Sequence, residues 1–227
     1  MELSFNLPEP ADGDLGGTLS LWGTFYYGQP AVESSAGVEI LNRAGQVVGP
    51  RISDKDWCHG AMEGTLIVKL ADGTTSTFNF DGTASTRQAN CKPFFTKLSD
   101  EKLAALEKTR FRRARGPFGD GAQNFVLSPY RTLAVDRAKI ALGTALYIPA
   151  ARGVDIVLPD NSPARHDGYF FAGDVGGAIK DNHVDFFLGV SRKNPFGFVK
   201  SKESETFEVR EVLNGGTRQF LRGLHEL

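Results

Sequence analysis

Short apolar stretches recur through the second half of the chain, and turn-forming residues separate them. The stretches are Thr132–Val135, Ala145–Ile148, Tyr169–Ala172, Val184–Leu188 and Phe207–Leu213, with clusters of Gly, Pro, Asn or Asp between them. Such spacing is typical of strands in a barrel or a sandwich rather than of βαβ units. The chain is therefore expected to be mainly β.

The first half contains a predicted hairpin and a predicted helix. Thr65–Leu70 and Thr74–Phe80 are rich in β-branched residues and are joined by Ala71-Asp72-Gly73, a combination that predicts a β-hairpin. Ser99 precedes a segment with acids at its start and bases at its end, which predicts a capped helix up to Lys108. Upstream, Thr18–Tyr27 alternates small or polar residues with bulky ones, as a strand does.

Composition and charge exclude several classes of function. The 227 residues carry a net charge of −1, which gives no reason to expect binding to nucleic acid or to an anionic membrane. The basic run Lys108–Arg115 is interpreted as the solvated end of the helix. No apolar run approaches the roughly 20 residues of a membrane span, so no integral membrane segment is expected.

The cysteines and the first residues bear on the compartment. Cys58 and Cys91 are the only cysteines, and their spacing fits neither a metal nor a redox motif. They are either two buried thiols or, in an oxidising compartment, a disulfide. Met1–Ser4 lacks the features of a signal peptide, so we expect either a mature or trimmed form or delivery by another route.

Two aspartates eleven residues apart are the strongest indication of a catalytic site. Asp174 follows a strand-like run, and Asp185 lies between Val184 and the pair Phe186-Phe187. An acid in apolar surroundings or beside another acid keeps its proton at higher pH, as a carboxyl that protonates a glycosidic oxygen must. The alternative is structural: Asp174 caps the turn at Gly176 and Gly177, and Asp185 is an ordinary strand residue.

Four ordered motif blocks resemble a known family. Together they are similar to the three-aspartate (3D) domain, which is shared by the membrane-bound lytic transglycosylases A and the stationary-phase-survival-type muralytic proteins. The resemblance covers about residues 130 to 189, with a weaker match at Ser20–Tyr27. The blocks are Leu133–Asp136, Ile140–Pro149, Asp174–Lys180 and Val184–Gly189.

The resemblance implies a fold and an organisation. It predicts a six-stranded double-psi β-barrel formed by residues 18–30 and 126–227. Residues 1–17 would form an N-terminal arm. Residues 31–125 would form an inserted lobe that contains the hairpin and one helix.

The resemblance also implies an activity, that of a peptidoglycan lytic transglycosylase. This lyase cleaves the MurNAc-GlcNAc β-1,4 bond and leaves 1,6-anhydroMurNAc, and we expect it to need no cofactor and no metal. By motif position Asp185 is the single acid/base, with Asp174 and Asp136 as the supporting aspartates. The predicted substrate-binding residues are Gly176, Gly177, Thr144, Lys180, Tyr26, Tyr27 and His166.

Two other functions fit the same sequence. One is a non-catalytic, expansin-like glycan-binding module, in which the acids only bind. The other is the same lytic activity in an exported antibacterial effector, for which an immunity protein would exist as a partner. In each case we expect a monomer that meets peptidoglycan glycan strands in the periplasm or cell wall.

Overall fold

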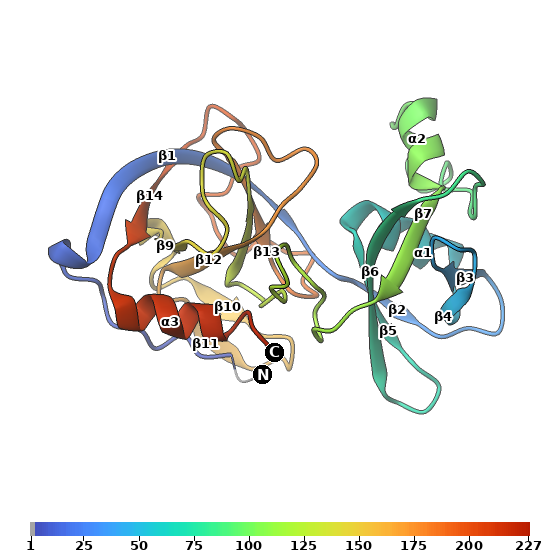
Figure 1. Ribbon diagram of the computed structural model, residues 1–227, viewed down its shortest axis with the longest axis horizontal. Helices are drawn as coiled ribbons and strands as arrows, with labels where there is room; N and C mark the ends of the chain where they lie inside the picture. The colour runs from blue at the N-terminus through green and yellow to red at the C-terminus, as the bar shows by residue number, and fades with distance from the viewer. Residues whose placement is uncertain (1–2) are drawn as a thin grey trace. The chain divides into compact units, whose positions relative to one another are not determined.

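The computed structural model describes residues 3–227, which divide into two compact units (Figure 1). One unit comprises the chain up to Tyr27 together with Asp120–Leu227, and the other comprises Gly28–Gly119. The limits of the second unit lie close to residues 31 and 125, the limits predicted for the inserted lobe. Most regular elements are strands, so the mainly β prediction is confirmed. None of the helices in residues 3–227 combines the length and the apolar character needed to cross a membrane.

Six strands of the first unit close into a barrel in the order β1-β13-β8-β12-β9-β14. Pairs β1/β13 and β8/β12 are parallel, and the other four neighbouring pairs are antiparallel. The double-psi topology itself stays a prediction. The strands are β1 (Leu15–Tyr26), β8 (Thr132–Val135), β9 (Ala145–Tyr147), β12 (Tyr169–Asp174), β13 (His183–Phe187) and β14 (Phe207–Val212).

Alternating residues of these strands fill the barrel interior. Leu133, Val184 and Phe186 belong to one continuous core of buried apolar side chains. Because successive side chains of a strand point to opposite faces, the residues between them face outward. Gly23 makes room for this core, since a Cβ there would lie 2.8 Å from the Phe186 ring.

A helix covers part of the outer face of the barrel. The helix α3 (Gly215–Gly223) begins after Asn214, whose side chain accepts a hydrogen bond from Thr217 N, and it buries Leu221. Leu221 belongs to a second apolar cluster with Phe171 and Val212 from β12 and β14. The sequence analysis did not predict this helix. The remaining elements of the unit are η1 (Asp12–Asp14), η2 (Pro149–Ala151), β10 (Asp155–Val157) and β11 (Pro163–Arg165).

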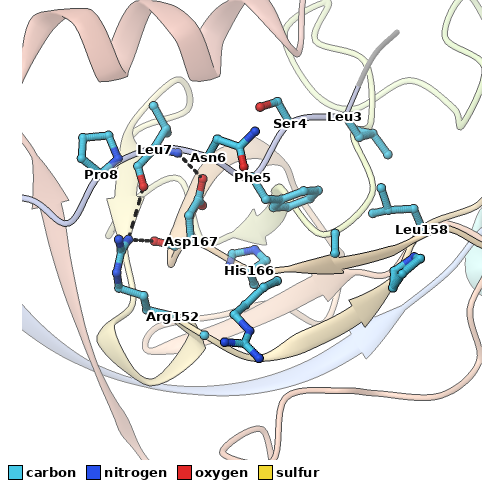
Figure 2. Close-up of a pocket in the computed structure, with 14 residues that line it drawn as sticks. Leu3, Ser4, Phe5, Asn6, Leu7, Pro8, Arg152, Leu158, His166 and Asp167 are labelled. Atoms are coloured by element: carbon cyan, nitrogen blue, oxygen red, sulfur yellow. Dashed lines mark hydrogen bonds between the residues drawn. The ribbon is translucent and has the colours of Figure 1, made fainter.

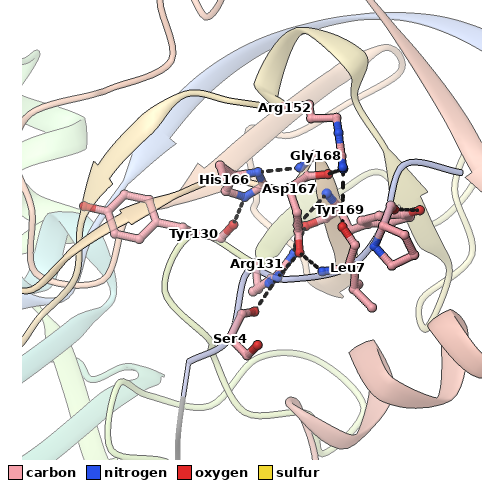
Figure 3. A network of polar contacts seen from close by, with 10 residues as sticks. Ser4, Leu7, Tyr130, Arg131, Arg152, His166, Asp167, Gly168 and Tyr169 are labelled. Carbon is pink, nitrogen blue, oxygen red and sulfur yellow. Dashed lines mark hydrogen bonds and ion pairs between the residues drawn. The ribbon is translucent and has the colours of Figure 1, made fainter.

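The segment before β1 is fastened to the barrel unit by a buried ion pair. Arg131 contacts Asp167 at 2.6 Å and also donates a hydrogen bond to the Ser4 carbonyl. The second oxygen of Asp167 accepts a hydrogen bond from Leu7 N at 3.0 Å. Figure 3 shows Ser4 and Leu7 of the N-terminal segment close to Arg131 and Asp167. The strand after this segment begins at Leu15, three residues before the predicted Thr18.

The second unit contains the predicted hairpin. Strands β5 (Thr65–Lys69) and β6 (Thr75–Thr83) pair in antiparallel fashion, which confirms that prediction. They lie in a four-stranded sheet with β2 (Gln29–Val32) and β7 (Thr109–Arg113), and β3 (Val38–Leu41) pairs with β4 (Val47–Ile52).

Two helices belong to this unit. The predicted helix α2 (Asp100–Leu106) has Ser99 as its N-cap. A second helix, α1 (Asp54–Glu63), was not predicted; it contains Cys58, which forms a disulfide with Cys91 and so settles the open alternative.

The basic run was wrongly interpreted as a helix end. Thr109–Arg113 forms strand β7, which pairs with β6. Arg110 is buried and donates hydrogen bonds to the Thr86 carbonyl and hydroxyl. Arg110 is therefore held by acceptors of the same unit, and Arg113 donates a hydrogen bond to Ser76 Oγ in β6.

Candidate active site

Asp174 and Asp185 lie on either side of one residue of the barrel. Asp185 in β13 pairs with Ala134 of β8, and Asp174 in β12 pairs with the same Ala134 from the other side. Neighbouring strands are about 4.8 Å apart, so the two aspartate backbones are separated by about 10 Å. The fold thus brings the two predicted acids to one level of the sheet.

An irregularity at Gly173 places Asp174 on the same face as Asp185. Ala172 pairs with Leu133, but the next pair is Asp174 with Ala134, so Gly173 is an extra residue in β12. Regular alternation from the core residue Ala172 would have turned Asp174 into the barrel interior. Bulges of this kind redirect a side chain and are frequent near active sites.

Asp185 is held by a threonine on the neighbouring strand. Thr24 pairs with Asp185 across β1 and β13, and its Oγ1 lies 2.7 Å from Asp185 Oδ1. Among the described residues, the hydrogen bonds of Asp185 leave its Oδ2 without a protein partner. Burial raises the pKa of Asp185 to about 6, against the lowering effect of the Thr24 hydrogen bond. This carboxyl can therefore both hold and release a proton near neutral pH.

Asp174 is held by Tyr26 and by its own strand end. Tyr26 donates a hydrogen bond to Asp174 Oδ2 at 2.7 Å, and Val175 N donates to Oδ1 at 2.8 Å. Burial raises the pKa of Asp174 to about 6 and the charge of Asp185 adds to it, although both hydrogen bonds lower it. For Asp185 too, burial is the first cause of the raised pKa.

Three residue pairs form a row along the outer face of β1 and β13, which we call the acid row. Trp22 stacks on His183 with ring centroids 3.7 Å apart, Thr24 lies beside Asp185, and Tyr26 packs against Phe187 at 5.1 Å. The sequence analysis missed Thr24 and His183. The alternation of Thr18–Tyr27 gave a signal for Thr24, since it puts Trp22, Thr24 and Tyr26 on one face.

A cavity of about 600 Å³ lies at the Trp22 end of the acid row. Trp22 and His183 form part of its wall, and exposed Lys180 and Glu203 bring charges of both signs to it. The remaining lining residues are Ala178, Asp181, Asn182 and Thr206. An aromatic ring beside polar groups is typical of a site for a small polar ligand.

Asp136 lies in the loop after β8 and joins two loops. Its Oδ1 accepts a hydrogen bond from Ala138 N, and its Oδ2 accepts one from Asp181 N, each at 2.9 Å. These backbone hydrogen bonds lower the pKa of Asp136. Asp136 therefore holds the loop between the other two aspartates and stays ionised.

The predicted binding residues of that loop differ in their surroundings. A Cβ on Gly176 would lie 2.6 Å from Ile179 Cγ1, whereas a Cβ on Gly177 would meet nothing within 4 Å. Neither glycine has a positive φ; the left-handed residue of this loop is Asp181, with φ 53°.

Thr144 and Tyr27 lie outside the hydrogen bonds of the two acids. Thr144 is placed by backbone hydrogen bonds with Ala141 and Ala172. Within residues 3–227, the side-chain donors to Asp174 and Asp185 are Tyr26 and Thr24. The Tyr27 ring lies 5.5 Å from the guanidinium of Arg192.

His166 is buried in the barrel unit rather than presented in the acid row. Its Nε2 lies 2.8 Å from the Tyr130 carbonyl, and its Nδ1 accepts a hydrogen bond from Gly168 N. Burial lowers the pKa of His166 to about 3. Figure 2 shows it beside Phe5 and Asp167, in the wall of a second cavity of about 660 Å³ that the N-terminal segment also lines. With both nitrogens occupied, it has no free group for a substrate.

Comparisons with known proteins agree with the fold. Residues 131–203 match the model of the 3D domain, a span that contains all three aspartates. No curated protein sequence matches the chain.

Among the solved structures that resemble the chain are two with TM-scores above 0.5. The structure of Escherichia coli MltA with bound chitohexaose is similar with a TM-score of 0.51 at 19% identity, covering 85% of this chain and 71% of that one. A membrane-bound lytic murein transglycosylase from Agrobacterium tumefaciens is similar with a TM-score of 0.53 at 14% identity, covering 89% and 76%. At these identities the likeness establishes a shared fold.

Proposed function

We propose, from the premise that this chain carries a 3D domain, that it is a murein lytic transglycosylase whose single acid/base is Asp185. The observation that carries the proposal is the position of Asp185: partly buried, with a pKa of about 6, and with one carboxyl oxygen left by the protein for a substrate. The lytic transglycosylases of the same fold support the choice of reaction. The double-psi form of the barrel is part of this proposal.

The reaction requires a group that changes its role. Neutral Asp185 gives its proton to the glycosidic oxygen as the bond from that oxygen to C1 of MurNAc breaks. The C6 hydroxyl oxygen of the same sugar then bonds to C1, and ionised Asp185 takes the hydroxyl proton. The proton has moved from one sugar oxygen to the other and the carboxyl is restored, as in two-step acid/base schemes with one carboxyl.

Asp174 is proposed to stabilise the positive charge that develops on the sugar ring. Its hydrogen bonds from Tyr26 and Val175 fix the carboxylate in place, and a fixed charge is effective where water is excluded. Asp136 is proposed to position the loop that leads from Asp174 to Asp185. Asp174 and Asp136 are proposed to contribute less to the rate than Asp185, because neither of them has to transfer a proton.

The glycan strand is proposed to lie along the acid row. Trp22 and Tyr26 offer aromatic surface, and the cavity beside Trp22 offers Lys180 to a lactyl or peptide carboxylate of peptidoglycan. Gly176, Gly177, Thr144 and Tyr27 are proposed contacts at its edges. This substrate places the site of action in the periplasm or cell wall.

Digestion of purified sacculi followed by mass spectrometry tests the proposal. We expect muropeptides with 1,6-anhydro ends, and a loss of about 10²–10⁴-fold in their release when Asp185 is replaced by Asn. Asp155→Asn, at an exposed carboxylate paired with Arg165, is the matched control and should release them at the parental rate. Reducing ends would instead identify a hydrolase, and binding without any product would identify a glycan-binding module. Normal release by Asp185→Asn would refute the assignment of the acid.

A further inference from the structure

Two loops flank Trp22 at the end of the acid row. One loop leads into β13, and its Asn182 carbonyl accepts a hydrogen bond from Trp22 N at 3.0 Å. The other loop leads into β14, and its Ser201 N donates a hydrogen bond to the Gly23 carbonyl at 3.1 Å. Because β1 pairs with β13 on one side and with β14 on the other, the two loops lie on either side of Trp22 and together line the cavity of about 600 Å³.

Each loop brings a charged side chain to this cavity. Lys180 comes from the first loop and Glu203 from the second, and both are exposed. Among the described residues neither side chain forms an ion pair, although the charge of Asp136 acts on Lys180 electrostatically. Asp181 adds a second carboxylate to the wall. A cavity with separate charges of both signs is complementary to a ligand that itself carries both.

The Trp22 ring gives the cavity an aromatic wall. His183 covers one face of this ring, with centroids 3.7 Å apart and planes 5° from parallel. Trp22 is nevertheless only half-buried, so part of its ring stays open to the cavity that it lines. Among the aromatic side chains an indole attracts a cation most strongly. The cavity therefore offers an ammonium group both a carboxylate and an aromatic ring.

We propose that this cavity binds a zwitterionic amino-acid end group, with Lys180 on its carboxylate and Glu203 on its ammonium group beside Trp22. The inference rests on the proposed function and deepens it, because in peptidoglycan such a group is the free end of a diamino-dicarboxylic residue in the stem peptide. A cross-link acylates that amino group and removes its charge. The site therefore selects glycan strands whose stems are not cross-linked.

The geometry lets one ligand reach both the acid and the cavity. Trp22 precedes Thr24, the partner of Asp185, by two residues of β1, which is about 7 Å along the strand. The diamino acid is the third residue of the stem, and three extended residues span about 10 Å. A MurNAc unit beside Asp185 can therefore place the diamino acid of its own stem in the cavity.

Binding of a muropeptide that cannot be cleaved tests the inference. The disaccharide GlcNAc-MurNAc with a tripeptide stem lacks the MurNAc-GlcNAc bond, so the unaltered protein can be titrated with it by calorimetry. We expect the form with a free diaminopimelate end to bind about threefold to fivefold more tightly than the form with that amino group acetylated. The same difference is expected from the form with that carboxylate amidated. This is the effect of one ion pair between exposed groups.

Two substitutions assign each preference to one side chain. Glu203→Gln should abolish the preference for the free amino group and keep the preference for the free carboxylate, and Lys180→Gln should do the reverse. Glu208→Gln, at an exposed carboxylate of β14 outside the cavity, is the matched control and should keep both preferences. All three side chains are exposed, so their replacement leaves the core intact.

Equal affinity for the three forms, or a preference that survives the substitution of its side chain, would overturn the inference. The result does not depend on cleavage. If the three forms are distinguished as expected but sacculi yield no anhydro-muropeptides, the proposed function fails and the binding site stands. If sacculi are cleaved and the three forms bind equally, the binding site fails and the proposed function stands.

Discussion

Asp185→Asn is expected to stabilise the protein at alkaline pH while it removes the proposed activity. In the folded protein burial raises the pKa of Asp185 from 3.8 to about 6. Above pH 6 the folded state therefore holds a charged carboxyl in a place that favours the neutral form. The difference of about 2.2 pKa units corresponds to about 3 kcal/mol of stability at 1.36 kcal/mol per unit.

The sign follows from the order of the two pKa values. As the pH rises, the unfolded chain releases this proton near pH 4, but the folded protein keeps it until about pH 6. The free energy of unfolding therefore falls between these values and stays lower above them. Asparagine keeps an oxygen that can accept a hydrogen bond from Thr24, and it cannot ionise. The Asp185→Asn protein therefore does not lose this stability as the pH rises.

Urea unfolding at two pH values measures the effect. Asp185→Asn should gain up to about 3 kcal/mol at pH 8 and no more than about 1 kcal/mol at pH 4.5. Asp155→Asn serves as the control and should change little at either pH, since its carboxylate is exposed. An Asp185→Asn protein that is no more stable than the parent at pH 8 would contradict the argument that burial disfavours this charge.

Three further substitutions test other parts of the structure. Cys58→Ser removes the disulfide to Cys91, which closes a loop with a sequence separation of 33, and should lower the free energy of unfolding of its unit by about 4 kcal/mol. Denaturant unfolding measures this loss, and the chemically reduced parent should show the same one. Gly176→Ala forces a contact of 2.6 Å with Ile179 and should slow anhydro-muropeptide release, whereas Gly216→Ala, whose Cβ would come no closer than 3.5 Å to another residue and which lies outside the proposed site, should keep the parental rate; equal rates would refute a steric need for Gly176. Asp167→Ala leaves Arg131 buried without its carboxylate and should cost about 3–5 kcal/mol in thermal or urea unfolding, and a near-neutral change would show that the pair is dispensable.

Local patterns predicted most of the barrel strands and the hairpin. Thr132–Val135 was predicted with the bounds that β8 has, and the hairpin turn at Asp72 and Gly73 matched the pairing of β5 with β6. In these segments the side-chain pattern, the turn residues and the final structure all agree. Such agreement lets a short window of sequence predict an element.

The two missed helices have N-cap residues, Ser53 and Asn214, but each also contains glycine, which disfavours a helix. Helix α1 contains Gly60, which disfavours a helix, yet a Cβ there would lie 2.2 Å from a side-chain atom of Leu66. Helix α3 begins with Gly215-Gly216 and is held by packing of Leu221 against the barrel. In both cases packing against a strand overrides the local cost of the glycines.

The same distinction applies to the site. The sequence predicted Asp174 and Asp185 as site residues because each is an acid next to apolar residues in the sequence. Thr24 lies 161 positions from Asp185, and only the parallel pairing of β1 with β13 brings them together. The bulge at Gly173 has a local signal, a glycine inside a strand, but the pairing of β12 with β8 is what shows that Asp174 faces outward.

The extra residue at Gly173 also limits how this region of the chain can evolve. If Gly173 instead paired with Ala134, regular alternation would turn the Asp174 carboxyl toward the barrel core, so a shift of the β12 register by one residue would damage the site and the packing at once. The loop between the two acids has no such constraint from strand pairing, because it lies outside β12 and β13. Among related chains we therefore expect the residue in the place of Asp174 to keep its position opposite Ala134 in β8.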